Sequence, residues 1–147
     1  MREFLVFQSQ WAMQDHRGQC DLPLEAQVEK IAAAGFDGIT DHFWLVQHAA
    51  RLHAAAKAQG LQIEGQVFPR TVDDLAAAID VAARFGCHHL TLQADVRPRT
   101  LKQAIELIEG WQRLAEQVDF PVLLETCLLY TSPSPRDLST SRMPSSA

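Results

Sequence analysis

Three glycines at nearly equal spacing mark the chain as a repeat of helices and strands. Gly35, Gly60 and Gly86 are 25 and 26 residues apart; each follows an alanine-rich stretch and is followed directly by an apolar residue, Phe36, Leu61 or Cys87. Glycine commonly ends a helix because it adopts the left-handed backbone conformation without steric cost. Strands that alternate with helices at this period predict βαβ units on a parallel sheet, and therefore an α/β fold.

The periodicity of apolar residues places the individual elements. Helices are predicted over 24–34, 45–59, 71–85 and 100–118, and strands over 3–9, 36–40, 61–67, 87–93 and 120–125. Thr71 is the expected cap of the third helix, and Thr100 with Gln103 predicts a capping box at the fourth. The core-facing stripe of the fourth helix is expected to include Leu101, Ile105, Ile108 and Trp111.

Two architectures accommodate such a repeat, an open doubly wound sheet and a (βα)8 barrel of about 250 residues. Residues 7–13, at the end of the first strand and directly after it, contain no glycine, whereas the dinucleotide-binding doubly wound fold places a glycine-rich loop there. Four βα units and a fifth strand make just over half a barrel. We therefore predict that residues 1–126 form the amino-terminal half of a TIM barrel.

Composition changes abruptly after residue 126. Residues 1–126 contain one serine, whereas residues 127–147 contain six serines and three prolines. The whole of 127–147 reads, in one frame, as a translated sequencing-library adapter, and 127–132 corresponds to TGT CTC TTA TAC ACA TCT. We therefore expect 127–147 to be a disordered, non-native tail, and the natural chain to be truncated at residue 126.

Charge and cysteine content restrict the partners. The formal net charge of the 147 residues is −5, which disfavours a nucleic-acid or anionic-membrane surface. No apolar run approaches the roughly 20 residues of a membrane helix. Three widely spaced cysteines without metal-binding spacing indicate a reduced, cytoplasmic location. The expected partners are a small molecule and further copies of the chain in a homo-oligomer, without nucleic acid or membrane.

Polar residues at the ends of the predicted strands are the candidate site. In a parallel βα fold the active site lies at the carboxyl ends of the strands, and alternation along each strand turns Gln66, Gln93 and Glu125 inward there. Glu125 is the candidate catalytic residue and metal ligand, since a carboxylate there transfers a proton or binds a divalent cation; the alternative is a structural pair with Lys or Arg. Gln66, Gln93 and Trp11 are the candidate substrate contacts, although Trp11 could equally anchor its loop.

Other polar residues allow two interpretations each. Glu64 points inward, where it is either functional or a buried, paired carboxylate. His42 lies above the second strand and belongs either to a pocket rim or to simple loop packing. His88 and His89 are adjacent, so strand alternation would turn them to opposite faces and prevent them from binding one inward metal together. Cys87 lacks any activating pattern and is expected in the core.

Four segments of the body, in their order and spacing, resemble one known family. They are 4–13, 31–39, 60–65 and 120–126, and together they are similar to the sugar-phosphate isomerase/epimerase group of xylose-isomerase-like TIM barrels. The resemblance implies that Glu125 is the first ligand of a divalent metal cation (Mn, Mg, Co or Zn), with the other ligands beyond residue 126. Thr40 stands where members of that family often have a glutamate.

The resemblance also implies an activity. The full-length parent protein, of which residues 1–126 would be the amino-terminal part, would be a metal-dependent isomerase or epimerase. It would transfer a proton between adjacent carbons of a sugar or sugar phosphate. Two alternatives belong to other classes. In one, the truncated chain has no catalytic activity and associates through its open sheet edges. In the other, the parent is a non-catalytic, sugar-binding TIM barrel.

Overall fold

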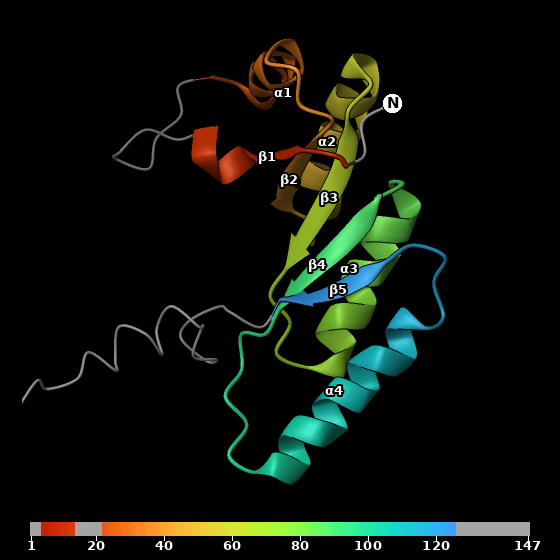
Figure 1. Cartoon of the computed structure of the whole chain (residues 1–147). Helices are drawn as coiled ribbons and strands as arrows, with labels where there is room; N and C mark the ends of the chain where they lie inside the picture. The colour runs from red at the N-terminus through yellow and green to blue at the C-terminus, as the bar shows by residue number, and fades with distance from the viewer. Residues whose placement is uncertain (1–3, 14–21, 126–147) are drawn as a thin grey trace, which may run out of the picture.

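Strands alternate with helices along residues 4–13 and 22–125, the part of the chain that the computed structural model describes (Figure 1). The strands are β1 (Phe7–Ser9), β2 (Gly38–His42), β3 (Gln62–Val67), β4 (His89–Gln93) and β5 (Val122–Glu125). The helices are α1 (Leu24–Ala33), α2 (Val46–Gln59), α3 (Val72–Arg84) and α4 (Leu101–Ala115), and a short 3-10 helix, η1 (Gln10–Met13), follows β1. The predicted alternation is confirmed, while the predicted tail, 127–147, lies outside the described residues.

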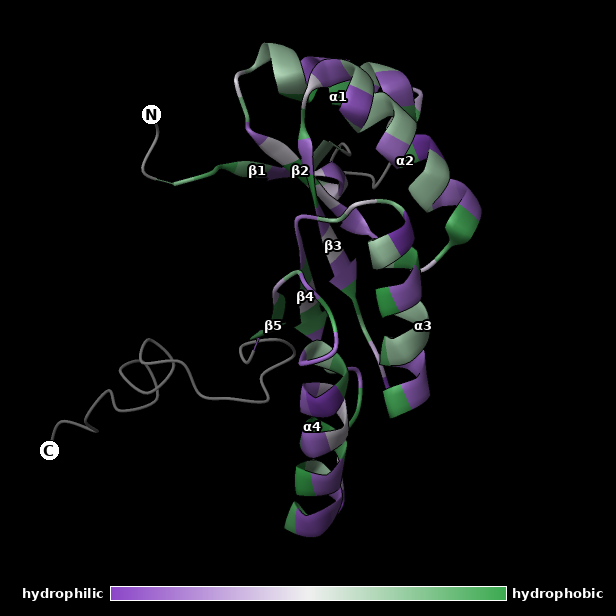
Figure 2. Cartoon of the chain, turned by 90° about the vertical axis from the view of Figure 1, so that its right-hand side faces the viewer, coloured by the Kyte–Doolittle hydropathy of each residue, from purple (hydrophilic) through white to green (hydrophobic). Residues whose placement is uncertain are grey.

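The strands form a single parallel sheet in which each strand pairs with the next along the chain, in the order β1-β2-β3-β4-β5. The helices lie together along one face of this sheet (Figures 1 and 2). A doubly wound sheet would instead carry helices on both faces and reverse its strand order once. The described residues therefore form part of a TIM barrel, as predicted.

The three spaced glycines end their helices in the same way. Gly35, Gly60 and Gly86 have positive φ angles of 84°, 69° and 65°. In each case the next residue donates its N–H to a carbonyl five residues earlier, which is the closing bond of a Schellman motif. These bonds join Phe36 to Ile31 at 3.4 Å, Leu61 to Ala56 at 2.9 Å, and Cys87 to Ala82 at 3.0 Å. Because Phe36 is part of such a helix end, β2 begins at Gly38 and not at residue 36.

The hydrophobic core lies between the sheet and the helices. Alternate strand residues face the helices and are buried; they include Ile39, Ile63, Val67, Leu90 and Leu92. The helices contribute a matching set of buried side chains, among them Val28, Ile31, Leu52, Leu75 and Ile79. Burial of this one strand face leaves the other face of the sheet for polar residues. Among the described helices, none combines the length and the apolar composition that crossing a membrane requires.

Two helices begin with the expected threonine caps. Thr71 Oγ1 accepts the Asp74 N–H at 3.1 Å, and the Asp74 carboxylate accepts the Thr71 N–H at 2.9 Å, so a complete capping box starts α3. At α4, Thr100 Oγ1 accepts the Gln103 N–H at 3.2 Å, but Gln103 Oε1 accepts the N–H of Arg99. The predicted capping box of α4 is therefore only half formed.

The predicted core stripe of α4 is largely exposed. Trp111 is buried, with 5% of its surface exposed, but Leu101, Ile105 and Ile108 expose 77%, 46% and 47%. The reason is that α4 contacts α3 on one side, while no described helix covers its other side. The same flank of the molecule includes β5, where Leu123 and Leu124 expose 50% and 46%.

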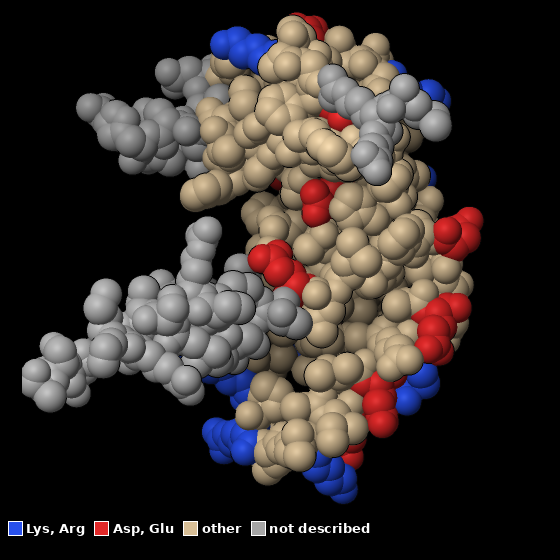
Figure 3. Space-filling model, viewed as in Figure 1, with Lys and Arg blue, Asp and Glu red and all other residues tan. Residues whose placement is uncertain are grey.

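The sheet curves, and the molecule has the shape of a crescent (Figure 3). The helices form its outer layer, and the strands line a hollow on the inner side (Figures 1 and 3). Acidic atoms are visible in this hollow, whereas Lys and Arg atoms lie toward the ends and the outer rim. We call the hollow the concave face; it consists of the strand residues whose side chains point away from the helices.

Candidate functional site

The register of the sheet determines which polar side chains meet on the concave face. Neighbouring strands are paired so that Thr40 lies beside Glu64, His42 beside Gln66, and Gln93 beside Glu125. Side chains of paired residues point to the same face of a sheet. Gln93 and Glu125 are the last residues of β4 and β5, so this pair lies at the carboxyl edge.

Gln93 and Glu125 form the best-defined polar pair at that edge. Gln93 Nε2 donates a hydrogen bond of 2.5 Å to Glu125 Oε2. Gln93 is 4% exposed, so its amide is held firmly, whereas Glu125 is exposed. Glu125 Oε1 accepts no hydrogen bond from any described residue. One carboxylate oxygen is therefore fixed, and the other is open to solvent or to a ligand.

Of the other two predicted substrate contacts, Gln66 lies near this pair and Trp11 lies apart from it. Gln66 is half-buried on β3, where its backbone carbonyl accepts the Phe43 N–H at 3.2 Å, and it pairs with Thr91, two residues before Gln93 on β4. Trp11 lies in η1 with 71% of its surface exposed, and β2 and β3 separate its strand from β4. The register thus brings Gln66, Gln93 and Glu125 to one face of three neighbouring strands, and the roles of all four predicted residues are still predictions.

Glu64 has partners on both of its carboxylate oxygens. Thr40 Oγ1 donates to Oε2 at 2.5 Å, and Thr91 Oγ1 donates to Oε1 at 2.6 Å. His89 Nε2 lies 3.4 Å from Oε1, and the Glu64 side chain is 18% exposed. Because these contacts tie β2, β3 and β4 together, the interpretation of Glu64 as a paired, structural carboxylate is the one that the geometry favours.

The adjacent histidines differ from the expectation based on alternation. His88 Nδ1 and His89 Nδ1 are 2.8 Å apart, and both rings contact Phe7 at centroid distances of 5.9 and 5.2 Å. The expectation that the two rings point apart was wrong because β4 begins at His89, so His88 lies outside the strand. A sequence pattern that places the strand at residue 87 cannot reveal this.

Three aromatic rings lie beside the carboxyl ends of β2 and β3. The His42 and Trp44 rings stack with centroids 4.8 Å apart and an interplanar angle of 29°. Phe68 lies 5.4 Å from the His42 ring and meets the Trp44 ring edge-on at 5.9 Å. Sequence reasoning singled out His42 but missed Phe68, since an apolar residue directly after a strand gives no signal of its own. We call these three residues the aromatic platform.

Cys87 occupies the core, as predicted. It is 7% exposed, and the Gly65 N–H donates to its Sγ at 3.1 Å. Burial raises the pKa of the Cys87 thiol from its ordinary value of 9.0 to about 11, although its hydrogen bonds with the backbone of Gly65 and His89 act in the opposite direction. Such a thiol is protonated at neutral pH and is a poor nucleophile.

The role of Glu125 as a metal ligand stays a prediction, because the other expected ligands would lie beyond residue 126. Over residues 4–13 and 22–125, no group of three His, Cys, Asp or Glu side chains is placed to hold a metal ion. Glu125 brings a single carboxylate, and the Gln93 amide N–H occupies one of its two oxygens.

Comparisons with known proteins give a fold and no family. No family model and no curated protein matches the sequence. Among solved structures, 3-dehydroquinate dehydratase from Geobacillus kaustophilus HTA426 is 15% identical with a TM-score of 0.59, and the match covers 80% of this chain and 48% of that chain. Dihydrodipicolinate synthase from Agrobacterium tumefaciens is 16% identical with a TM-score of 0.56, over 82% and 44%.

A third similar structure is the 4-hydroxy-tetrahydrodipicolinate synthase of Methylacidiphilum fumariolicum SolV, at 14% identity and a TM-score of 0.62 over 83% of this chain and 44% of that chain. The chain thus spans less than half the length of these three structures. Their names are those of a dehydratase and of synthases, and the expected resemblance to xylose-isomerase-like proteins is wrong. The metal-dependent isomerase or epimerase inferred from it is wrong as well. What the likeness shows is the fold, part of a TIM barrel.

Proposed function

We propose that the chain is part of a TIM-barrel enzyme that binds a small polyhydroxylated molecule on the concave face, where Glu125 transfers a proton. The observation that carries the proposal is the Gln93–Glu125 pair, a carboxylate with one oxygen fixed and one open. It lies at the carboxyl edge of the sheet, where TIM-barrel enzymes place their active sites. A cytoplasmic location, expected from the three widely spaced cysteines, belongs to the same proposal.

The two residues of the pair have different tasks. Glu125 Oε1 accepts a hydrogen bond from a substrate hydroxyl, or takes a proton from the carbon beside a carbonyl. Gln93 positions the carboxylate through its amide N–H, because its own side chain is buried and its place is fixed by the sheet. Gln66 and Trp11 are proposed as further contacts to the substrate.

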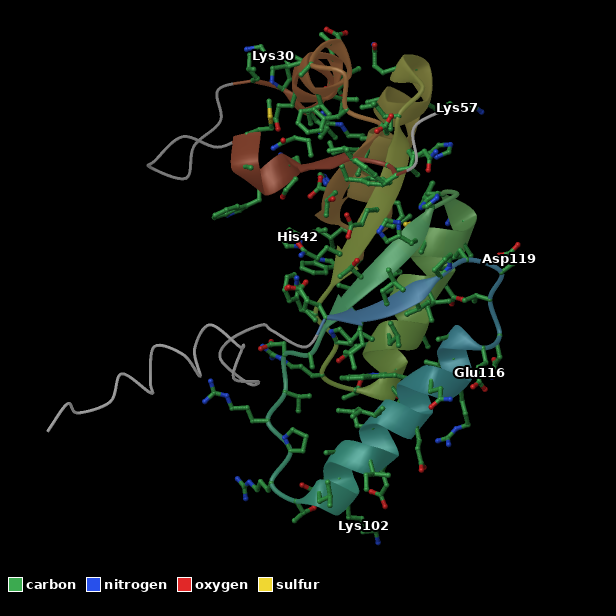
Figure 4. The ribbon with its side chains drawn as sticks, in the orientation of Figure 1. Lys30, His42, Lys57, Lys102, Glu116 and Asp119 are labelled. Atoms are coloured by element: carbon green, nitrogen blue, oxygen red, sulfur yellow. The ribbon has the colours of Figure 1, made fainter. Side chains whose placement is uncertain are left out.

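The similarity to a dehydratase and to synthases supports an enzyme that acts on small molecules. Covalent catalysis through a lysine amine is one route in carbonyl chemistry. The lysines of this sequence are Lys30, Lys57 and Lys102, on α1, α2 and α4, and Figure 4 shows them at the helices, while His42 lies on the inner side. The residues of this chain therefore contribute acid–base and positioning groups, and no imine-forming lysine.

Binding to the 147-residue chain tests the proposal. Sorbitol and myo-inositol, added to isotope-labelled protein, should shift NMR signals of β4 and β5 and of the Gln93 side-chain amide. The variant Glu125→Gln should bind at least about tenfold more weakly, since hydrogen bonds to a charged group contribute about 1.5–3 kcal/mol.

Glu29→Gln is the matched control. Glu29 is exposed on α1, within the outer layer of helices, so this variant changes the same chemical group away from the concave face and should bind like the unmodified chain. Equal affinity of Glu125→Gln and the unmodified chain, or the absence of any shift at β4 and β5, would refute the proposed function.

A further inference from the structure

The aromatic platform is exposed although its loop is already anchored. Phe43 stands between His42 and Trp44 and is completely buried, whereas Trp44 exposes 44% of its surface and His42 is exposed as well. The buried ring of Phe43 fastens the segment to the core, so loop packing does not require the rings on either side. Exposed aromatic rings that meet each other are available for a ligand.

The platform and the Gln93–Glu125 pair lie along the same edge of the sheet. His42 is the last residue of β2, Trp44 follows two residues later, and Phe68 follows directly after β3. Since all the strands are parallel, these positions share the carboxyl edge with the ends of β4 and β5. A ligand at this edge would meet aromatic rings on the side of β2 and β3, and a carboxylate on the side of β5.

The geometry of the rings favours a flat, neutral ligand. His42 stacks on the Trp44 ring and Phe68 meets it edge-on, so the rings form a continuous surface and do not surround a ligand. A quaternary ammonium group is typically bound by a cage of several ring faces. The CH face of a saturated six-membered ring instead suits a single aromatic face.

Charges near the platform are already paired. Arg70, two residues after Phe68, contacts the Asp95 carboxylate at 2.6 Å. Asp74, which lines a cavity of about 280 Å³ together with Trp44 and Phe68, accepts the N–H groups of Arg70 and Thr71. The Arg70 charge is therefore neutralised by Asp95, Asp74 is held in the capping box of α3, and the other residues that line the cavity are apolar.

From this arrangement we infer that the aromatic platform binds the ring of a cyclic polyol, and so selects cyclic over open-chain substrates. The inference rests on the proposed function and names its substrate class. The ring lies against the exposed part of Trp44, and its hydroxyl groups remain available for hydrogen bonds to polar groups at the strand ends. An open-chain polyol offers the same hydroxyl groups but no flat CH face.

The test compares two polyols with six carbons and six hydroxyl groups each, cyclic myo-inositol and open-chain sorbitol. In the 147-residue chain, myo-inositol should shift the indole N–H signal of Trp44 and bind about three- to tenfold more tightly than sorbitol, which is the range of an aromatic ring contact. Trp44→Leu should remove this preference, and Trp44→Phe should restore most of it. Leu45→Ala, which shortens an exposed neighbour outside the platform, should leave the preference intact.

The outcomes separate this inference from the proposed function. Equal binding of the two polyols, with a loss in Glu125→Gln, would overturn the platform and leave the proposed function standing. A Trp44 shift specific to myo-inositol that is unchanged in Glu125→Gln would support the platform and overturn the role of Glu125. A stronger Trp44 response to choline than to myo-inositol, or no Trp44 response to myo-inositol at all, would also overturn the inference.

Discussion

Two glutamates on the concave face show how neighbours decide what a carboxylate can do. Glu64 receives two threonine hydroxyls and lies near a histidine, while Glu125 receives one amide N–H and keeps an oxygen open. Strand alternation predicted that both point inward. It could not predict the partners, because the contact of Thr40 with Glu64 depends on strand register, which periodicity does not specify.

The buried thiol of Cys87 makes stability depend on pH in the alkaline range. The folded chain holds the pKa of this thiol at about 11, against an ordinary value of 9.0 that applies to the unfolded chain. Below pH 9 both states keep the proton and stability is complete. Between pH 9 and about 11 only the unfolded state loses it, so we expect the free energy of unfolding to fall by on the order of 2–3 kcal/mol.

Urea unfolding at several pH values measures this dependence. The variant Cys87→Ala lacks the titrating thiol and should show a flatter profile over the same range, and the difference between the two profiles isolates the contribution of Cys87. Identical profiles would contradict the prediction. In a background of Cys20→Ser and Cys127→Ser, Cys87 should also resist alkylation at pH 8 until the chain is unfolded.

At the scale of elements, the helix ends were predictable and the helix contacts were not. Glycine spacing predicted where α1, α2 and α3 end, and the three helices do close through the same backbone motif. No comparable sequence pattern predicted the contact between α3 and α4. Gly110, in the middle of α4, is buried, although glycine is a poor helix former and nothing around it in the sequence indicates a close approach.

Gly110 allows α4 to approach the first residue of α3. A Cβ atom at this position would lie 2.4 Å from Val72 Cγ2, and valine, being β-branched, has little freedom to move aside. Gly110→Ala should therefore be destabilising by up to about 2 kcal/mol, because overpacking of about 1–3 kcal/mol exceeds the roughly 1 kcal/mol that alanine gains in helix propensity. Urea unfolding followed by tryptophan fluorescence measures the change.

The double variant Val72→Ala, Gly110→Ala provides the matched comparison. With the valine methyl groups removed, alanine at position 110 should be neutral or stabilising relative to Val72→Ala alone. If Gly110→Ala by itself raised the free energy of unfolding, the close contact would not be a constraint and the prediction would fail.

At the scale of the molecule, the fold class followed from the repeat, but the expected family did not. Two of the resembling segments, 31–39 and 60–65, coincide with helix ends and the strands that follow them. Any βα unit needs such segments, because a glycine ends the helix and a buried strand follows it in each unit. Their order therefore indicates a barrel and cannot distinguish one barrel family from another.

Within the described residues both edges of the sheet are open, and we expect the 147-residue chain to associate. One edge has β1, preceded by the exposed Phe4, and the other has β5, with Leu124 46% exposed. Exposed strand edges with apolar side chains pair readily with other chains. Sedimentation or light scattering should give an average mass above the 16.4 kDa of one chain, and this mass should increase with concentration.

A charge on the edge strand tests the cause of association. Leu124→Lys should shift the chain toward the monomer, whereas Leu45→Lys, which alters an exposed leucine before α2, should not. A monomer at all concentrations, or equal effects of the two variants, would contradict the prediction.

The strand order has a consequence for the way in which the chain acquires its structure. Every paired strand is the next in sequence, and partners such as Glu64 and His89 are only 25 residues apart. Short sequence separation lowers the entropic cost of each pairing and favours rapid folding. Each βα unit can therefore assemble on the preceding one while the ribosome is still synthesising the next, so that structure grows from the amino terminus without waiting for the barrel to close.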